Sequence, residues 1–87
     1  MDVSAMDGFA VSGELAAGDY LPISGVIPAG ASPDCELEAE TTMRIMTGAP
    51  VPLGADRVVP VEQTSSTEDE VLFRSGTEPG AHIRRRA

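Results

Sequence analysis

The sequence has no lysine and no tryptophan, and it has a single cysteine, a single histidine, one tyrosine and two phenylalanines. With Cys35 alone, an internal disulfide is excluded, and a reducing cytoplasm is the expected location. With His82 alone, neither a histidine-based metal site nor a Ser/His/Asp triad finds its parts in the chain. We therefore do not expect these residues to form a complete active site.

Long apolar runs are also missing. No stretch approaches the roughly 18 residues of a membrane span, and no charged-then-apolar leader opens the chain. The nine glycines are scattered, so there is no glycine-rich phosphate loop. These absences predict a cytoplasmic chain that neither crosses a membrane nor cradles a nucleotide by itself.

Basic residues are scarce as well. Fourteen acidic residues stand against six arginines, for a net charge of −8. Three of these arginines are Arg84–Arg86, most simply a solvated tail. Residues 1–83 then have fourteen acidic groups against three basic ones, a formal charge of −11. Nucleic acids and anionic membranes would be repelled by such a surface. Positive groups for a phosphorylated ligand must therefore come from elsewhere.

What the chain has is glycine and proline among aliphatic residues. Its 87 residues, with nine glycines and seven prolines, suit short strands joined by tight turns. A chain of this length buries only about 60–65% of its unfolded surface, so the core should be thin. We predict a single all-β domain over residues 1–87, an irregular set of short, bent sheets with Pro/Gly-rich turns.

The pattern of apolar residues predicts where the strands lie. Pro22 and Gly25 indicate an edge or bent strand, and Pro60 an edge strand or a bulge. The three glutamates that alternate along 35–40 are interpreted as a solvated strand face rather than a metal site. We expect a helical turn within 12–17, a turn at 28–30 and a hairpin loop at 63–70. The expected strands are 8–11, 20–27, 35–40, 41–47, 57–62, 70–74 and 80–84.

Two segments, residues 4–11 and 44–52, each place a small oxygen-bearing side chain next to a glycine: Asp7 before Gly8, and Thr47 before Gly48. Either residue can simply shape its own turn. Alternatively, Asp7 can bind Mg²⁺ or orient a water, and Thr47 can donate a hydrogen bond to an oxyanion. Arg44 is interpreted as a partner for a carboxylate rather than as a substrate ligand.

These segments resemble a known family. Ser4-Ala5-Met6-Asp7-Gly8-Phe9-Ala10-Val11, then Arg44-Ile45-Met46-Thr47-Gly48-Ala49-Pro50-Val51-Pro52, then Gly54-Ala55-Asp56-Arg57-Val58-Val59-Pro60 with Glu62 are similar to motifs of the molybdopterin molybdenumtransferases. This family of molybdenum insertases includes the E-domain of gephyrin. The segment Gly80-Ala81-His82-Ile83-Arg84 resembles the end of the same stretch. The likeness covers nearly the whole chain, in the same order.

The resemblance implies a function in molybdenum cofactor biosynthesis. Family members are homodimers of four-domain subunits, and this stretch looks like the second domain, which is all-β and inserted into the first. The family reaction inserts molybdate into adenylylated molybdopterin and releases AMP with the help of Mg²⁺. Its site lies between the second domain of one subunit and the third domain of the partner subunit.

Residue by residue, the resemblance implies catalytic roles for Asp7 and Thr47, with Asp7 as the Mg²⁺ ligand. It implies that the substrate site is lined by Ser4, Met6, Gly8 and Gly48. Phe9 stands where the family often has tyrosine, so packing is the expected role there.

Three expectations follow from the resemblance. The isolated chain should be catalytically inert and monomeric, and its two ends should lie close together, as in an inserted domain. A non-catalytic β spacer or interaction module of a larger protein is the alternative. Preference for molybdate or tungstate, and any further fused domains, are left open by the sequence.

Overall fold

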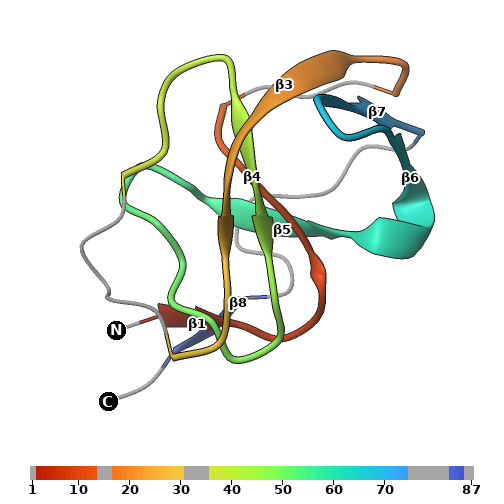
Figure 1. Ribbon diagram of the computed structural model, residues 1–87. Coiled ribbons are helices and arrows are strands. Elements are labelled where there is room, and N and C mark those ends of the chain that lie inside the picture. The colour runs from red at the N-terminus through yellow and green to blue at the C-terminus, as the bar shows by residue number, and fades with distance from the viewer. Residues whose placement is uncertain (1, 14–16, 31–35, 75–82, 86–87) are drawn as a thin grey trace.

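The computed structural model describes residues 2–13, 17–30, 36–74 and 83–85, and of residues 2 and 83–85 only the backbone. These residues form an all-β structure (Figure 1), which confirms the predicted fold class. Among them, no helix is long and apolar enough to cross a membrane. A short 3₁₀ helix, η1 (Val61–Gln63), follows the fifth strand. The strands are β1 (Asp2–Ser4), β2 (Gly8–Val11), β3 (Tyr20–Ile27), β4 (Thr42–Ile45), β5 (Arg57–Pro60), β6 (Thr64–Ser66), β7 (Glu70–Phe73) and β8 (Ile83–Arg85).

Six of these strands form one mixed, curled sheet in the order β5-β2-β4-β3-β7-β6. The β3–β4 pair is parallel and the other pairs are antiparallel. Strands β1 and β8 form a separate antiparallel pair in which Asp2 is opposite Arg85. The expectation that the chain ends lie together concerns Met1 and Ala87, which are outside the described residues. The strands next to them do pair side by side.

Strand β3 is bent by a bulge between Ile23 and Gly25, as the predicted break suggested. Its first half pairs only with β7 and its second half only with β4. In the order of the sheet β3 lies between β4 and β7, but each half of the strand is paired on one side only. An extra residue reverses the side to which the following side chains point. Leu21 and Ile23 accordingly pack on one side of the sheet and Ile27 on the other.

The sheet consequently has a core on each side. The first core consists of Phe9, Val11, Val59, Val71 and Phe73, and the second of Ala10, Ile27, Ile45, Ala49 and Val58. Phe9 and Phe73 meet edge to face, with ring centroids 6.4 Å apart and planes at 84°. All ten residues are fully buried. Neighbours in strands β2 and β5 alternate between the two cores, which leaves every side chain of β2 buried.

Most of the predicted strands are present. The expected strands at 8–11, 20–27, 41–47, 57–62 and 70–74 correspond to β2, β3, β4, β5 and β7 within a few residues. Of the strand expected at 80–84, residues 80–82 lie outside the described residues, and 83–84 belong to β8. Strand β5 is at the edge of the sheet, as Pro60 suggested. The turn at 28–30 is confirmed, with Gly30 at φ 84°.

Two predictions about local structure were wrong. Within the described part of 35–40 there is no strand, only an isolated bridge between Glu36 and Leu53, because the chain turns at Glu40 with φ 61°. The hairpin loop expected at 63–70 is shorter, since Thr64–Ser66 form β6 and the turn spans 67–69. The predicted helical turn at 12–17 falls partly on residues 14–16, which lie outside the described residues.

Candidate functional site

The two glycine-bearing bends predicted from the sequence meet in space. The backbone N–H of Ser4 donates to the carbonyl of Ala49, and the N–H of Gly48 donates to the carbonyl of Ser4, both at 2.9 Å. The N–H of Val61 donates to the carbonyl of Asp7 at 3.2 Å, which attaches η1 to the same corner. Segments about 40 residues apart are thereby held in one rigid arrangement.

Asp7 and Thr47 are direct partners at this corner. The backbone N–H of Thr47 donates to Asp7 Oδ1 at 2.7 Å, and the Thr47 hydroxyl donates to the same oxygen at 2.9 Å. The backbone bond first, and then the hydroxyl bond, hold the pKa of Asp7 below its usual value; partial desolvation opposes them, and the charge of Arg44 adds to them. Asp7 is exposed and ionised at neutral pH, and its Oδ2 accepts no hydrogen bond from the described residues.

The proton of the Thr47 hydroxyl is therefore already in use. A threonine hydroxyl has one proton to donate, and here it points at Asp7. While that bond is present, Thr47 cannot donate to an oxyanion, which was one of the two roles that the sequence left open for it. In this geometry its effect is to fix and ionise the Asp7 carboxylate.

Glycine is required at the two positions of this corner for different physical reasons. The turn after β4 needs a left-handed backbone at Gly48, where φ is 83°, and glycine adopts this conformation without strain. Gly8 lies in extended backbone, but a Cβ there would be 2.1 Å from the carbonyl oxygen of Val59. Only glycine allows β2 to approach β5 this closely. Their expected contact with substrate stays a prediction.

The structure also places Ser4 and Met6. Ser4 is 2% exposed, and its hydroxyl donates to the carbonyl of Met6 and accepts from the Met6 N–H at 3.3 Å. The side chain of Ser4 is thus turned into the bend, away from solvent. Met6 is half-buried and borders a shallow hollow of about 170 Å³, which is lined by Met6, Asp7, Pro60, Val61 and Glu62.

Val61 and Glu62 were not singled out from the sequence as neighbours of Asp7. They reach this corner because Gly8 is opposite Pro60 in the β2–β5 pair, and that register is a tertiary property.

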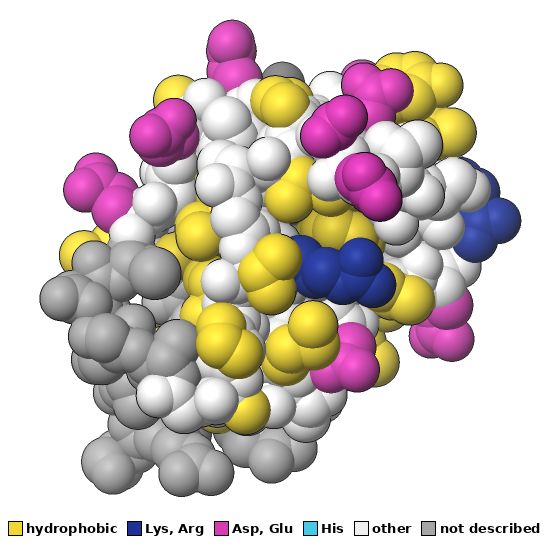
Figure 2. Space-filling model, viewed as in Figure 1, with side chains coloured by type: hydrophobic (Ala, Val, Ile, Leu, Met, Phe, Trp, Pro, Cys, Tyr) yellow, Lys and Arg dark blue, Asp and Glu magenta, His cyan; other side chains and the backbone are white. Residues whose placement is uncertain are grey.

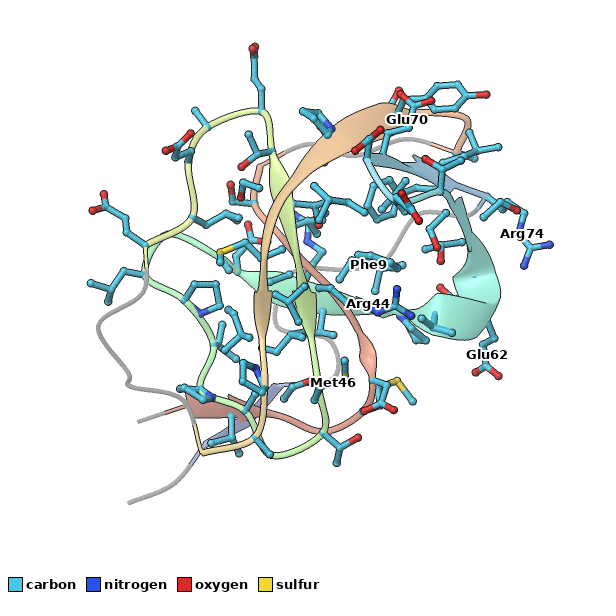
Figure 3. The ribbon with its side chains drawn as sticks, viewed as in Figure 1. Phe9, Arg44, Met46, Glu62, Glu70 and Arg74 are labelled. Atoms are coloured by element: carbon cyan, nitrogen blue, oxygen red, sulfur yellow. The ribbon has the colours of Figure 1, made fainter. Side chains whose placement is uncertain are left out.

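Arg44 was expected to pair with a carboxylate. Instead its guanidinium lies over the Phe9 ring, 5.7 Å from the centroid (Figure 3).

The described residues offer too few ligands here for a resident metal. Among the described residues there is no group of three or more histidine, cysteine, aspartate or glutamate side chains that could hold a metal ion. Mg²⁺ in proteins is commonly bound by one or two carboxylates together with waters and substrate phosphates. The free oxygen of Asp7 fits the first part of such a set, and the remaining ligands would come from outside this chain.

Comparison with known proteins decides the family. The family model of the MoeA N-terminal region (domain I and II) matches residues 1–87. The chain belongs to this family. The resemblance to the molybdopterin molybdenumtransferases, which was proposed from the motifs around Asp7 and Thr47, is thereby confirmed.

Individual MoeA relatives agree. Molybdopterin molybdenumtransferase 2 of Mycobacterium tuberculosis is 48% identical over 90 residues, which cover 97% of this chain and 22% of that protein. The molybdopterin molybdenumtransferase of Nostoc sp. is 36% identical over 92 residues, 99% of this chain and 21% of the relative. The chain therefore spans about a fifth of the length of the curated relatives it matches.

The fold is found in a solved MoeA structure. The molybdopterin biosynthesis MoeA protein from Pyrococcus horikoshii superimposes with a TM-score of 0.87 at 29% identity, over 97% of this chain and 23% of that chain. The all-β arrangement seen here is thus an arrangement that a MoeA protein adopts within a much longer chain.

Proposed function

We propose that this chain is the all-β second domain of a molybdopterin molybdenumtransferase and forms one wall of an active site between two subunits. In that site molybdate is inserted into adenylylated molybdopterin with release of AMP, and the opposite wall is the third domain of the partner subunit in a homodimer. The proposal places the parent protein in the cytoplasm. The observation that supports it most directly is the exposed, ionised Asp7, held by two hydrogen bonds from Thr47.

The chemistry of Asp7 favours binding over proton abstraction. A carboxylate whose pKa lies below its usual value is a weak base, far from the near-neutral pKa that suits general base catalysis. Its free Oδ2 is suited to accept a hydrogen bond from water or to bind a cation. Mg²⁺, when bound, would neutralise part of the charge on the substrate phosphates. Thr47 would keep the carboxylate ionised and correctly oriented for that contact.

The size of the corner supports a composite site. Small-molecule sites usually enclose about 300–1,000 Å³, and the hollow beside Asp7 has about 170 Å³. A pterin joined to a nucleotide does not fit into it. We therefore expect the purified 87-residue chain to release no AMP from adenylylated molybdopterin. Measurable release by the chain alone would contradict the proposal.

The decisive experiment is molybdenum insertion by the full-length parent with Asp7→Asn, measured beside its thermal melt. The amide oxygen of asparagine can still accept from Thr47, so the fold should be retained while the negative charge is lost. We expect a large loss of rate with an unchanged melt. The matched control is Asp69→Asn, an exposed aspartate in the turn between β6 and β7, which should leave the rate unchanged.

If Asp7→Asn retains full activity, or if its loss of activity follows a lowered melting temperature, Asp7 is only a turn residue. The chain would then be a structural spacer or an interaction module of the parent, the alternative function that the sequence left open.

A further inference from the structure

Arg44 has an unusual position for the cation of an acidic protein. It lies in β4, opposite Phe9 of β2 and beside Val26 of β3. Its side chain is exposed, and the guanidinium is seated on the Phe9 ring at 5.7 Å, within the range of a cation–π contact. Figure 2 shows apolar side chains around a central cationic group, which Figure 3 labels as Arg44. The Phe9 ring is itself buried and in T-shaped contact with Phe73, which holds it in place beneath the guanidinium.

Arg44 also differs from the other arginines whose side chains are described. Arg57 is 4% exposed and donates to Asp56 and to the carbonyl of Gly13. Arg74 donates to the carbonyl of Glu62 at 2.6 Å. The guanidinium of Arg44 makes no hydrogen bond or ion pair with any described residue. Its five N–H donors are held in place, and no described residue accepts from them.

The candidate site lies next to these donors. Asp7 is two residues before Phe9, which is opposite Arg44 in the β2–β4 pair, and Thr47, which holds Asp7, is three residues after Arg44. The positive charge of Arg44 acts on the Asp7 carboxylate. The Thr47 hydroxyl, the other donor expected at this corner, is engaged with Asp7. Among the described side chains at this corner, that of Arg44 therefore has donors available for an anion.

We propose that Arg44 binds a tetrahedral oxyanion of the substrates, molybdate or the phosphate of adenylylated molybdopterin, beside the Asp7 carboxylate. The inference rests on the proposed function. A guanidinium offers two parallel N–H donors that match two oxygens of such an anion. Even with Arg44 counted, residues 1–83 have a formal charge of −11, and the hollow at this corner is lined by Asp7 and Glu62. Arg44 offsets part of this negative charge where an anion would bind.

The test uses the full-length parent with Arg44→Gln and Arg44→Lys, measuring kcat, the KM for each substrate, and the melt. Equilibrium binding of molybdate alone, and of AMP alone, is measured by calorimetry. We expect Arg44→Gln to raise one KM by about tenfold or more and to weaken binding of the matching anion, because a charge-assisted bidentate contact is lost. Arg44→Lys should recover part of this, since it keeps the charge but not the fork.

The arms identify the anion. If Arg44→Gln raises the KM for molybdate and weakens molybdate binding, Arg44 binds molybdate. If it raises the KM for adenylylated molybdopterin and weakens AMP binding, Arg44 binds the phosphate. The control for net charge is Arg74→Gln, which should change neither KM. If Arg44→Gln changes neither KM nor binding, or only lowers the melting temperature, the inference is wrong. If Asp7→Asn abolishes activity in the same assay, the proposed function stands without it.

Discussion

Replacing Gly8 with alanine should destabilise the fold strongly, because of space rather than backbone conformation. The added Cβ would lie 2.1 Å from the carbonyl oxygen of Val59 and 2.9 Å from its carbon, where atoms keep at least about 3 Å. Both contacts are with backbone, so no side chain can rotate away, and β2 must move from β5. Overpacking of this kind costs ~3 kcal/mol. In a chain of this size that lowers the melting temperature by roughly 12–24 °C.

The assay is a thermal melt of the purified chain followed by circular dichroism, with Gly25→Ala as matched control. Gly25 is also a strand glycine, but its Cβ would meet only the flexible end of Met43 at 3.0 Å. We expect this control to melt within a few degrees of the parent sequence. If Gly8→Ala melts no lower than Gly25→Ala, the close approach of β2 to β5 does not set the requirement for glycine.

Thr47→Val should raise the pKa of Asp7 toward its usual value without fully restoring it, because the hydrogen bond from the backbone N–H of Thr47 remains. An NMR titration of the Asp7 carboxyl carbon measures this pKa, and an unchanged value would refute the prediction. The stabilisation from Asp7 is present above the usual pKa of about 4 and is lost as pH falls through the lowered one. Thr47→Val, which removes the hydroxyl bond to the ionised carboxylate, should therefore cost more stability at pH 7 than at pH 2, as denaturant melts would show. Asp56→Ala leaves buried Arg57 without its carboxylate and should cost about 2 kcal/mol in the same melts; a neutral result would refute that pairing as a stabiliser.

The sequence predicted both bends of the site but not their contact. Asp7-Gly8 and Thr47-Gly48 are local signals, and glycine is required at both positions. That Thr47 donates twice to Asp7 depends on pairing between β2 and β4, which brings residues 40 apart together. No local pattern contains that register, so the use of the hydroxyl proton could not be predicted.

The missed elements have physical reasons of the same kind. The alternation at 35–40 is real for Leu37, which is buried between two exposed glutamates. It does not extend to Ala39, because the turn at Glu40 changes direction first. Strand β6 has the sequence Thr64-Ser65-Ser66, with no apolar alternation, and it forms because β7 offers its free edge. Strand formation there is a tertiary effect that composition does not reveal.

The order of strands in the sheet has a consequence for how the chain folds. Among the described strands, β6–β7 is the only antiparallel pair that joins strands adjacent in sequence; the β3–β4 pair is parallel and needs a crossover. Strand β2 pairs with β4 and β5, and Asp2 of β1 pairs with Arg85 of β8. Such non-local pairing is slow, since long loops must close before any contact rewards them. During synthesis, β2 has no partner until β4 emerges and lacks its second until β5 is complete. The corner of Asp7 and Thr47 therefore cannot form before β4 and the turn that follows it have been synthesised.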